Sequence, residues 1–285
     1  MAERVTIYEV SPRDGLQNEP RLIGTADKIR LVDLLSACGF SHIEVTSFVS
    51  PRRVPQMADA AQVLAGIRRT PGTTYAALTP NQQGFQHAMK ARAGEVAVFA
   101  SASEGFSQKN INCSIAESIE RFRPVLAAAR TAGIPVRGYV SCVTDCPCNG
   151  PVAPEAVARV AQALLDLGCH QISLGDTLGA GTPETIGRML ETVLERIPAA
   201  RLAGHYHDTR GRALDNIRIS LARGLRVFDS SAGGLGGCPF APGARGNVAT
   251  ETVVAMLHRM GFATGIDPAR LQEAADFALS LRSRQ

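Results

Sequence analysis

The sequence predicts an α/β protein with the fold of a (β/α)8 TIM barrel and additional C-terminal helices. Strand-like and helix-like segments alternate along all 285 residues, a pattern typical of a parallel sheet. The length suits one barrel, which typically needs about 250 residues. Ser11–Gly15 follows the first strand, where an open dinucleotide-binding sheet would carry Gly-x-Gly-x-x-Gly. We expect a single catalytic domain over residues 1–285, with a core at about 4–262 and a helical extension at about 263–285.

Eight strands are predicted from short β-branched or apolar runs. They cover Val5–Val10, His42–Thr46, Thr73–Leu78, Glu95–Ala100, Pro135–Cys142, Gln171–Leu174, Arg201–Tyr206 and Val227–Ser230. Helical spacing of apolar residues predicts a helix after each strand; Thr25 serves as the N-cap of the first, which stops at Gly39. The helices cover residues 26–37, 59–69, 81–91, 115–132, 154–167, 182–196, 210–223, 248–260 and 268–281.

Composition excludes several classes of protein. The net charge of +4 is spread without a basic run, so neither nucleic acid nor a membrane surface is an expected partner. No apolar run reaches the roughly 18 residues of a membrane span. A strand begins near Arg4, so no targeting peptide is expected. The seven cysteines are odd in number and scattered, which favours reduced thiols in the cytoplasm over disulfides.

The segment His205-Tyr-His-Asp208 is the centre of the functional prediction. It lies at the end of a predicted strand, where residues two apart face the same side. His205 and His207 can therefore direct two imidazoles at one divalent metal ion. The alternative is a pair of rim histidines satisfied by hydrogen bonds. Asp208 is interpreted as a cap of the following helix, or else as a partner that orients an imidazole.

Barrel enzymes place their active-site residues at the carboxyl ends of the strands. Here these ends carry Arg13 and Asp14, Glu44, Ser141, Asp176, the two histidines and Ser230. Strands one and seven are two positions apart around a barrel, so Asp14 can join the histidines as a ligand, unless it is a solvated loop charge. Asn247 could add a neutral oxygen, or could instead cap a helix ahead of Val248. This donor set suits Mg²⁺, Mn²⁺, Co²⁺ or Zn²⁺.

A glycine-rich run, Gly233-Gly-Leu-Gly-Gly-Cys-Pro-Phe240, follows the last strand. It lacks the Lys-Ser/Thr ending of a phosphate loop, and its glycines suit a lid. Cys238 in this lid is a candidate proton donor, with a spare thiol as the alternative. Cys146-Pro-Cys148 has no second pair at zinc-site spacing, so these cysteines are interpreted as loop or core thiols.

Several stretches resemble the 3-hydroxy-3-methylglutaryl-CoA (HMG-CoA) lyases, which belong to the barrel metallolyases together with isopropylmalate and homocitrate synthases. The resemblance covers nearly the whole chain. It rests on Glu9–Glu19, Thr46–Pro51, Val54–Met57, Lys109–Ser114, Val136–Cys142, Ser173–Thr177, His205–Thr209 and Asp229–Asn247. It implies a carbon–carbon lyase whose acyl-CoA substrate is HMG-CoA, which it cleaves to acetoacetate and acetyl-CoA. It also implies a need for Mg²⁺ or Mn²⁺, with Co²⁺ or Zn²⁺ as alternatives, and a homodimer.

The resemblance also implies residue roles. Asp14, His205 and His207 correspond to metal ligands, with Asn247 as a further or water-mediated one. Arg13 corresponds to the residue that stabilises the enolate oxygen, and Cys238 to the thiol that assists proton transfer. The expected supporting acids are Glu44 and Asp176, and the expected substrate contacts are Arg13, Gln17, Asn110, Ser173 and Thr177.

The chain departs from the family pattern at Arg210, Phe240 and Cys148, where relatives often carry tyrosine. Two of these departures lie in loops near the mouth of the barrel and leave the acyl specificity open. Related substrates are citramalyl-type or longer branched 3-hydroxyacyl-CoA diacids. The leader and C-terminal Cys-Lys-Leu of organellar forms are absent, which favours a bacterial cytoplasmic enzyme. The alternatives are a Claisen-type synthase, a metal-dependent hydrolase and a non-catalytic CoA-binding scaffold.

Overall fold

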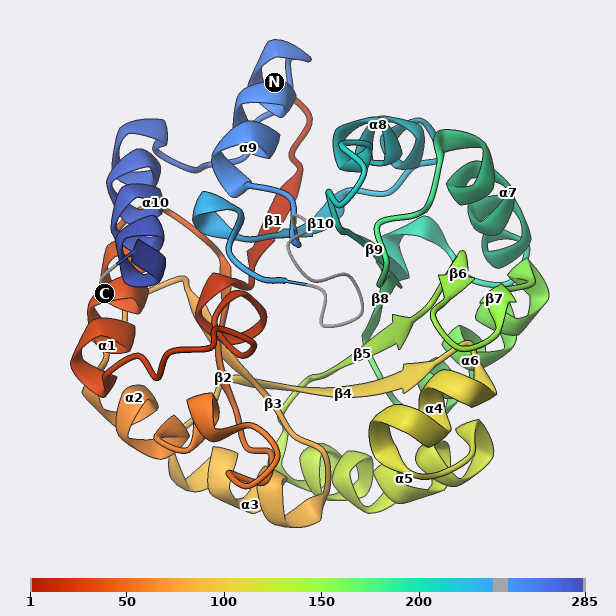
Figure 1. Cartoon of the computed structure of the whole chain (residues 1–285), viewed down its shortest axis with the longest axis horizontal. Coiled ribbons are helices and arrows are strands. Elements are labelled where there is room, and N and C mark those ends of the chain that lie inside the picture. Colours follow the sequence, from red (N-terminus) through yellow and green to blue (C-terminus); the bar gives the residue numbers. More distant parts are fainter. Residues whose placement is uncertain (1, 238–245, 284–285) are drawn as a thin grey trace.

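A computed structural model describes residues 2–237 and 246–283, and its centre is a closed barrel of parallel strands (Figure 1). Around the barrel the strands run in the order β1-β10-β9-β8-β5-β4-β3-β2. Their bounds are β1 Thr6–Glu9, β2 His42–Ser47, β3 Thr74–Leu78, β4 Glu95–Ser101, β5 Val136–Ser141, β8 Gln171–Asp176, β9 Leu202–Tyr206 and β10 Val227–Ser230. Pairing of β1 with β10 closes the ring, which confirms the predicted (β/α)8 fold.

Helices surround the strands on the outside (Figure 1). Their bounds are α1 Thr25–Ser36, α2 Ala60–Gly66, α3 Gln82–Lys90, α4 Glu104–Ile111, α5 Ile115–Ala132, α6 Pro154–Leu167, α7 Pro183–Leu194, α8 Ala213–Ala222, α9 Thr250–Arg259 and α10 Pro268–Ser283. The C-terminal α10 lies against α1 (Figure 1). None of the helices in the described ranges is long and apolar enough to cross a membrane.

Local chemistry explains the best-predicted helix bounds. The α5 helix begins after Ser114, whose hydroxyl accepts from the backbone N–H of Glu117 while the Glu117 carboxylate accepts from the Ser114 N–H. This reciprocal capping box satisfies two N–H groups that the first turn leaves free. The helix ends at Gly133, which adopts a left-handed conformation with φ of 67° that glycine tolerates without strain.

Several local predictions were wrong. The helix α4 and the antiparallel hairpin of β6 (Asp145–Cys146) and β7 (Gly150–Pro151) were not expected. The N-cap of α1 is Gly24 rather than Thr25, because the Thr25 hydroxyl donates to Asp59 instead. The N-cap of α9 is Ala249, so Asn247 does not cap that helix.

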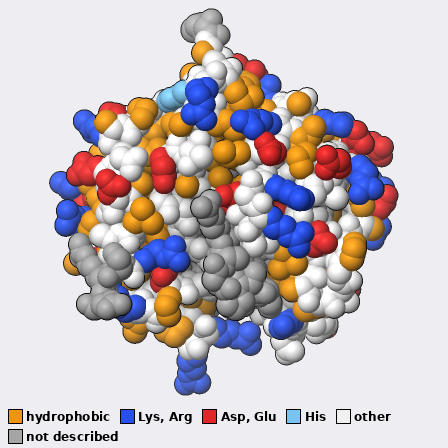
Figure 2. Space-filling model, turned by 45° about the horizontal axis from the view of Figure 1, so that its top comes forward, with side chains coloured by type: hydrophobic (Ala, Val, Ile, Leu, Met, Phe, Trp, Pro, Cys, Tyr) orange, Lys and Arg blue, Asp and Glu red, His pale blue; other side chains and the backbone are white. Residues whose placement is uncertain are grey.

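Charged groups lie inside the barrel as well as on its surface. Glu9, Glu44, Glu95, Arg137 and Asp229 are all at most 2% exposed. A buried charge is costly unless it is paired, so these residues must be held by specific partners. On the outer face shown in Figure 2, by contrast, acidic and basic side chains are interspersed.

Candidate functional site

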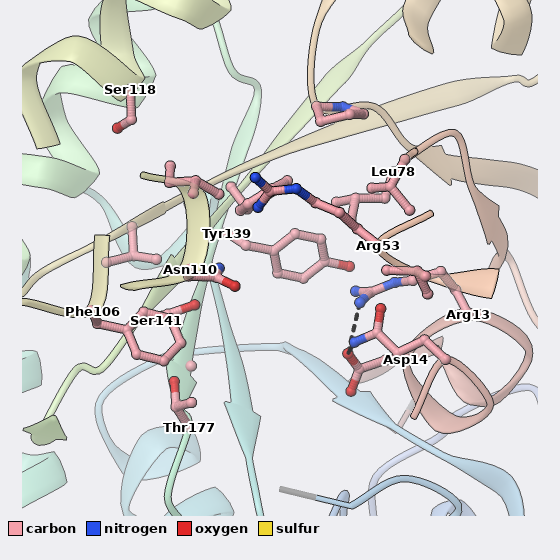
Figure 3. A pocket seen from close by; sticks show the side chains of 18 of the residues that line it. Arg13, Asp14, Arg53, Leu78, Phe106, Asn110, Ser118, Tyr139, Ser141 and Thr177 are labelled. Carbon is pink, nitrogen blue, oxygen red and sulfur yellow. Dashed lines mark hydrogen bonds and ion pairs between the residues drawn. The ribbon is translucent and has the colours of Figure 1, made fainter. Parts of the chain in front are cut away.

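A cavity of about 1000 Å³ opens at the carboxyl ends of the strands. Arg13 and Asp14 lie on one side of it beside the Tyr139 ring, and Asn110 and Thr177 lie on the opposite side (Figure 3). Both histidines of the β9 segment also line it. Residues from the first and seventh strand–helix units therefore share one cavity, as barrel geometry requires.

Asp14, His205 and His207 form the one cluster of metal-ligand side chains found within residues 2–237 and 246–283, with ligand atoms all within 4.8 Å of one another. Asp14 belongs to a short π-helical turn, Ser11–Gly15, that directly follows β1. His205 is near the end of β9, and its Nε2 lies 3.9 Å from Asp14 Oδ2. The structure thus brings together the three residues that period-two spacing and strand order predicted.

Asn247 contacts this cluster through Asp14 and does not lie at the start of a helix. Its Nδ2 donates to Asp14 Oδ2 at 2.7 Å and to the carbonyl of Leu235 at 3.2 Å. It also pairs with His207 in an isolated β-bridge. Asn247 therefore ties the segment after β10 to the Asp14 carboxylate. Asp208, next to His207, accepts from the N–H of Ala213 at 3.2 Å, the first residue of α8, although the N-cap position of that helix is Arg212.

Arg13 lies between two carboxylates. Its Nε donates to Glu44 Oε2 at 2.6 Å, and its Nη1 donates to Asp14 Oδ1 at 2.6 Å. Burial by itself would lower the pKa of Arg13, but the charges of Glu44 and Asp14 outweigh it and raise that pKa. The guanidinium also lies over the Tyr139 ring, 5.5 Å from its centroid. Arg13 is therefore a fixed positive charge at the cavity wall.

The expected supporting acids differ in their placement. Glu44 is fully buried and contacts Arg13. Asp176 instead accepts from the backbone N–H groups of Ala180 and Gly181 and from the Thr144 hydroxyl. Burial raises the pKa of Asp176. Asp176 thus holds the loop after β8 in place through these hydrogen bonds, and it does not line the cavity.

Three of the expected substrate contacts besides Arg13 line the cavity, namely Gln17, Asn110 and Thr177. Gln17 also donates to Asp14 Oδ1 at 3.2 Å. Ser173 does not reach the cavity, because it is fully buried and its hydroxyl donates to Asp229 Oδ2 at 2.7 Å.

Sequence reasoning missed Asp229 and Arg137. Asp229 Oδ2 accepts a hydrogen bond from His205 Nδ1 at 3.1 Å, and both Asp229 oxygens pair with the guanidinium of Arg137. The available signal was a charged residue inside each of two predicted barrel strands. Strands enclosed on both faces are typically apolar, so opposite charges there indicate a pair.

The predicted proton donor, Cys238, lies outside the described residues. The other six cysteines are free thiols. Cys142 and Cys146 are buried and Cys148 is exposed, in agreement with their interpretation as core or loop thiols.

The cluster has the chemistry of a divalent-metal site. Burial, together with the neighbouring His205, lowers the pKa of His207 to about 4. Burial by itself would raise the pKa of Asp14, but the charges of Arg13 and the two histidines outweigh it and lower that pKa to about 2. A neutral imidazole and an ionised carboxylate are the forms that bind cations. His207 Nδ1 is buried without a hydrogen-bond partner in the described part of the chain, a cost that a metal ligand would remove.

His205 differs from His207 in its electrostatic surroundings. Burial by itself would lower the pKa of His205, but the hydrogen bond and charge of Asp229 outweigh it and raise that pKa. Because the pKa of His205 is raised and that of His207 is lowered, a binding cation must compete with a proton at His205 more than at His207. Together, one carboxylate and two imidazoles at the mouth of a parallel barrel define the barrel enzymes that act with a divalent cation.

Comparisons with known proteins identify the family within that class. The model of the HMGL-like family matches residues 4–278. A 3-hydroxy-3-isohexenylglutaryl-CoA/hydroxymethylglutaryl-CoA lyase from Pseudomonas aeruginosa is 57% identical over 96% of this chain and 91% of its own. The chain belongs to the HMGL-like family and is a carbon–carbon lyase.

Solved structures agree with this assignment. The crystal structure of the HMG-CoA lyase from Brucella melitensis has a TM-score of 0.98 at 62% identity, covering 99% of this chain and 100% of that one. An HMG-CoA lyase from Acinetobacter baumannii, solved with coenzyme A and 3-methylmalate, has a TM-score of 0.93 at 38% identity, covering 98% of this chain and 92% of that one.

Proposed function

We propose that this enzyme cleaves 3-hydroxy-3-methylglutaryl-CoA to acetoacetate and acetyl-CoA, with Mg²⁺ or Mn²⁺ held by Asp14, His205 and His207. The observation that carries the proposal is the placement of this cluster beside the buried Arg13 guanidinium on one cavity wall. Cleavage of this kind needs a group that favours loss of the hydroxyl proton and a positive group for the electrons that the broken bond releases.

When bound, a divalent cation supplies Lewis-acid polarisation that makes a hydroxyl group more acidic. The C3 hydroxyl loses its proton, the C2–C3 bond breaks, and its electron pair passes to the thioester as an enolate. Arg13 donates charge-assisted hydrogen bonds to the enolate oxygen. Asp14 or a neighbouring group accepts the hydroxyl proton. The Cys238 thiol, or water, then protonates the enolate carbon and so completes acetyl-CoA.

The assay is incubation of the purified protein with HMG-CoA, with and without Mg²⁺ or Mn²⁺. Equimolar acetoacetate and acetyl-CoA are the expected products. His207→Ala should lose activity, whereas His87→Ala, which removes an exposed histidine on α3, should not. Consumption of acetyl-CoA with a 2-oxo acid would indicate a synthase instead. Ester or amide hydrolysis would indicate a hydrolase, and cation binding without turnover would indicate a scaffold.

A second candidate function is cleavage of 3-hydroxyglutaryl-CoA thioesters with a longer branched group at C3. An apolar cluster of Leu78, Ala97, Tyr139 and Phe99 lies on β3, β4 and β5. Three of these side chains, Leu78, Phe99 and Tyr139, line the cavity together with Arg13. The volume of about 1000 Å³ is at the upper end of the usual range for small-molecule sites. Comparable kcat/KM for methyl and longer substrates would support this function, and cleavage of the methyl substrate alone would exclude it.

Cytoplasmic location and a homodimer complete the proposal. Six free thiols among the described residues are consistent with a reducing compartment. The family resemblance is the basis for the homodimer, and sedimentation velocity of the purified chain would test it.

A further inference from the structure

The Asp229 carboxylate makes four hydrogen bonds inside the barrel. It accepts from His205 Nδ1 at 3.1 Å and from the Ser173 hydroxyl at 2.7 Å, both at Oδ2. The guanidinium of Arg137 donates to Oδ2 at 3.1 Å and to Oδ1 at 2.7 Å. Three strands, β5, β8 and β9, thus each send one side chain to a single carboxylate on β10.

This arrangement determines which nitrogen of His205 carries a proton. Both Asp229 oxygens accept from the Arg137 guanidinium, so Asp229 has no proton of its own to donate to His205. The neutral imidazole must then hold its proton on Nδ1. Nε2 is then the bare nitrogen, and it is the atom that lies 3.9 Å from Asp14 Oδ2. A histidine ligand commonly donates its other ring N–H to a carboxylate, which fixes both the tautomer and the ring direction.

Arg137 holds the carboxylate in that position. Its side chain and that of Asp229 are both 0% exposed. Its Nη1 also donates to the Tyr139 hydroxyl at 3.1 Å, and its guanidinium lies 4.0 Å from the centroid of the Tyr8 ring. A buried ion pair is often no more stabilising than apolar residues of similar volume. Stability alone is therefore a weak reason for this pair.

His207 provides an internal comparison. Its Nδ1 is buried and has no partner at hydrogen-bond geometry in the described residues. The backbone of Thr177 is a neighbour that favours its protonated form, but no carboxylate among those residues fixes its tautomer. Within residues 2–237 and 246–283, His205 is the only one of the two imidazoles near Asp14 whose other ring nitrogen hydrogen-bonds to a carboxylate.

We propose that Asp229, held by Arg137 and Ser173, is a positioning residue that sets the tautomer and direction of His205 so that Nε2 faces Asp14. This inference rests on the proposed cation site, but it makes a claim about the metal-free protein as well.

The first test is Asp229→Asn, studied without substrate. Titration of the metal-free protein with Mn²⁺ should show about 10- to 100-fold weaker binding, the usual cost of losing such a partner. Nitrogen-15 shifts of the His205 ring should show the Nδ1–H tautomer in the parent, at a pH where the ring is neutral, and a mixture or the Nε2–H tautomer in the variant. Unchanged affinity with an unchanged tautomer would overturn the proposal.

A second test separates positioning from stability. Arg137→Met/Asp229→Leu replaces the whole ion pair with apolar side chains, which is expected to leave stability similar. The matched control is Lys28→Met/Asp59→Leu, which removes a partly buried ion pair at α1, away from the site. We expect weaker Mn²⁺ binding only in the first double variant. Parental affinity in both would show that the pair is merely structural.

Ser173→Ala keeps the test decisive if the double variant does not fold. It removes one donor to Asp229 and should weaken Mn²⁺ binding less than Asp229→Asn does; an effect as large, or none in either, would contradict the proposal. If the parent itself binds no Mn²⁺, the cation site fails, whereas the tautomer measurement still decides whether Asp229 positions His205.

Discussion

Replacement of Arg13 by methionine tests the proposed stabilisation of the enolate. Arg13 is 6% exposed, and its guanidinium contacts Glu44 and Asp14, each at 2.6 Å. Methionine keeps an unbranched side chain but removes the charge and every N–H donor. Two effects must then be separated, since the substitution affects both the reaction and the buried partner Glu44.

The expected loss in kcat is about 10²–10³-fold, which is about 2.7–4 kcal/mol of transition-state stabilisation. Stability should also fall, because a buried carboxylate that loses its partner costs roughly 3–5 kcal/mol. Burial already raises the pKa of Glu44, so protonation will reduce that cost. Adding Glu44→Gln removes the unpaired charge, and the double variant should regain stability while kcat stays low.

The assay follows acetyl-CoA release over a range of HMG-CoA concentrations, with urea unfolding measured on the same samples. Low kcat with similar KM in both variants would support a role confined to the transition state. A raised KM with unchanged kcat would make Arg13 a binding residue. Recovery of kcat in the double variant would show that instability caused the loss, and the enolate role would be refuted.

Three other predictions concern the cation, the thiol and a buried acid. Exhaustive chelation should abolish cleavage and Mg²⁺ or Mn²⁺ should restore it, and His207→Ala should bind Mn²⁺ at least ~10-fold more weakly; full activity in a sample shown by elemental analysis to be metal-free would contradict this. A thiol reagent should inactivate the enzyme, a substrate analogue should protect it, and Cys238→Ser should fold but turn over slowly; peptide mapping identifies the labelled cysteine, and parental turnover would leave Cys238 a spare thiol. Burial raises the pKa of Glu9 from 4.5 to about 7, so the folded state holds this proton more tightly than the unfolded chain and stability should fall as pH rises through that window. The loss over that window is roughly 3 kcal/mol. Urea unfolding of Glu9→Gln should lack this slope, and an identical slope in that variant would exclude Glu9 as its source.

Patterns with a fixed period were readable from the sequence. Strand alternation placed His205 and His207 on one face, and the position after β1 placed Asp14 at the same end of the barrel. The short helix α4 was not readable, because its apolar spacing is weak and it ends at Asn112 in a left-handed conformation rather than at glycine. The Arg137–Asp229 pair was missed although each charge inside a barrel strand is a signal in the sequence, because local patterns do not show which charged residues face each other across the barrel.

Pairing of β1 with β10 has a consequence for how the enzyme folds. Asp14 follows the first strand, whereas His205, His207 and Asn247 belong to the last third of the chain. Contacts between residues so distant in sequence form slowly, because loop-closure entropy must be overcome first. An amino-terminal fragment that ends before β9 would hold Asp14 without the histidines. In refolding experiments, the appearance of cation binding would therefore mark closure of the barrel. A bound cation would favour the closed barrel by mass action.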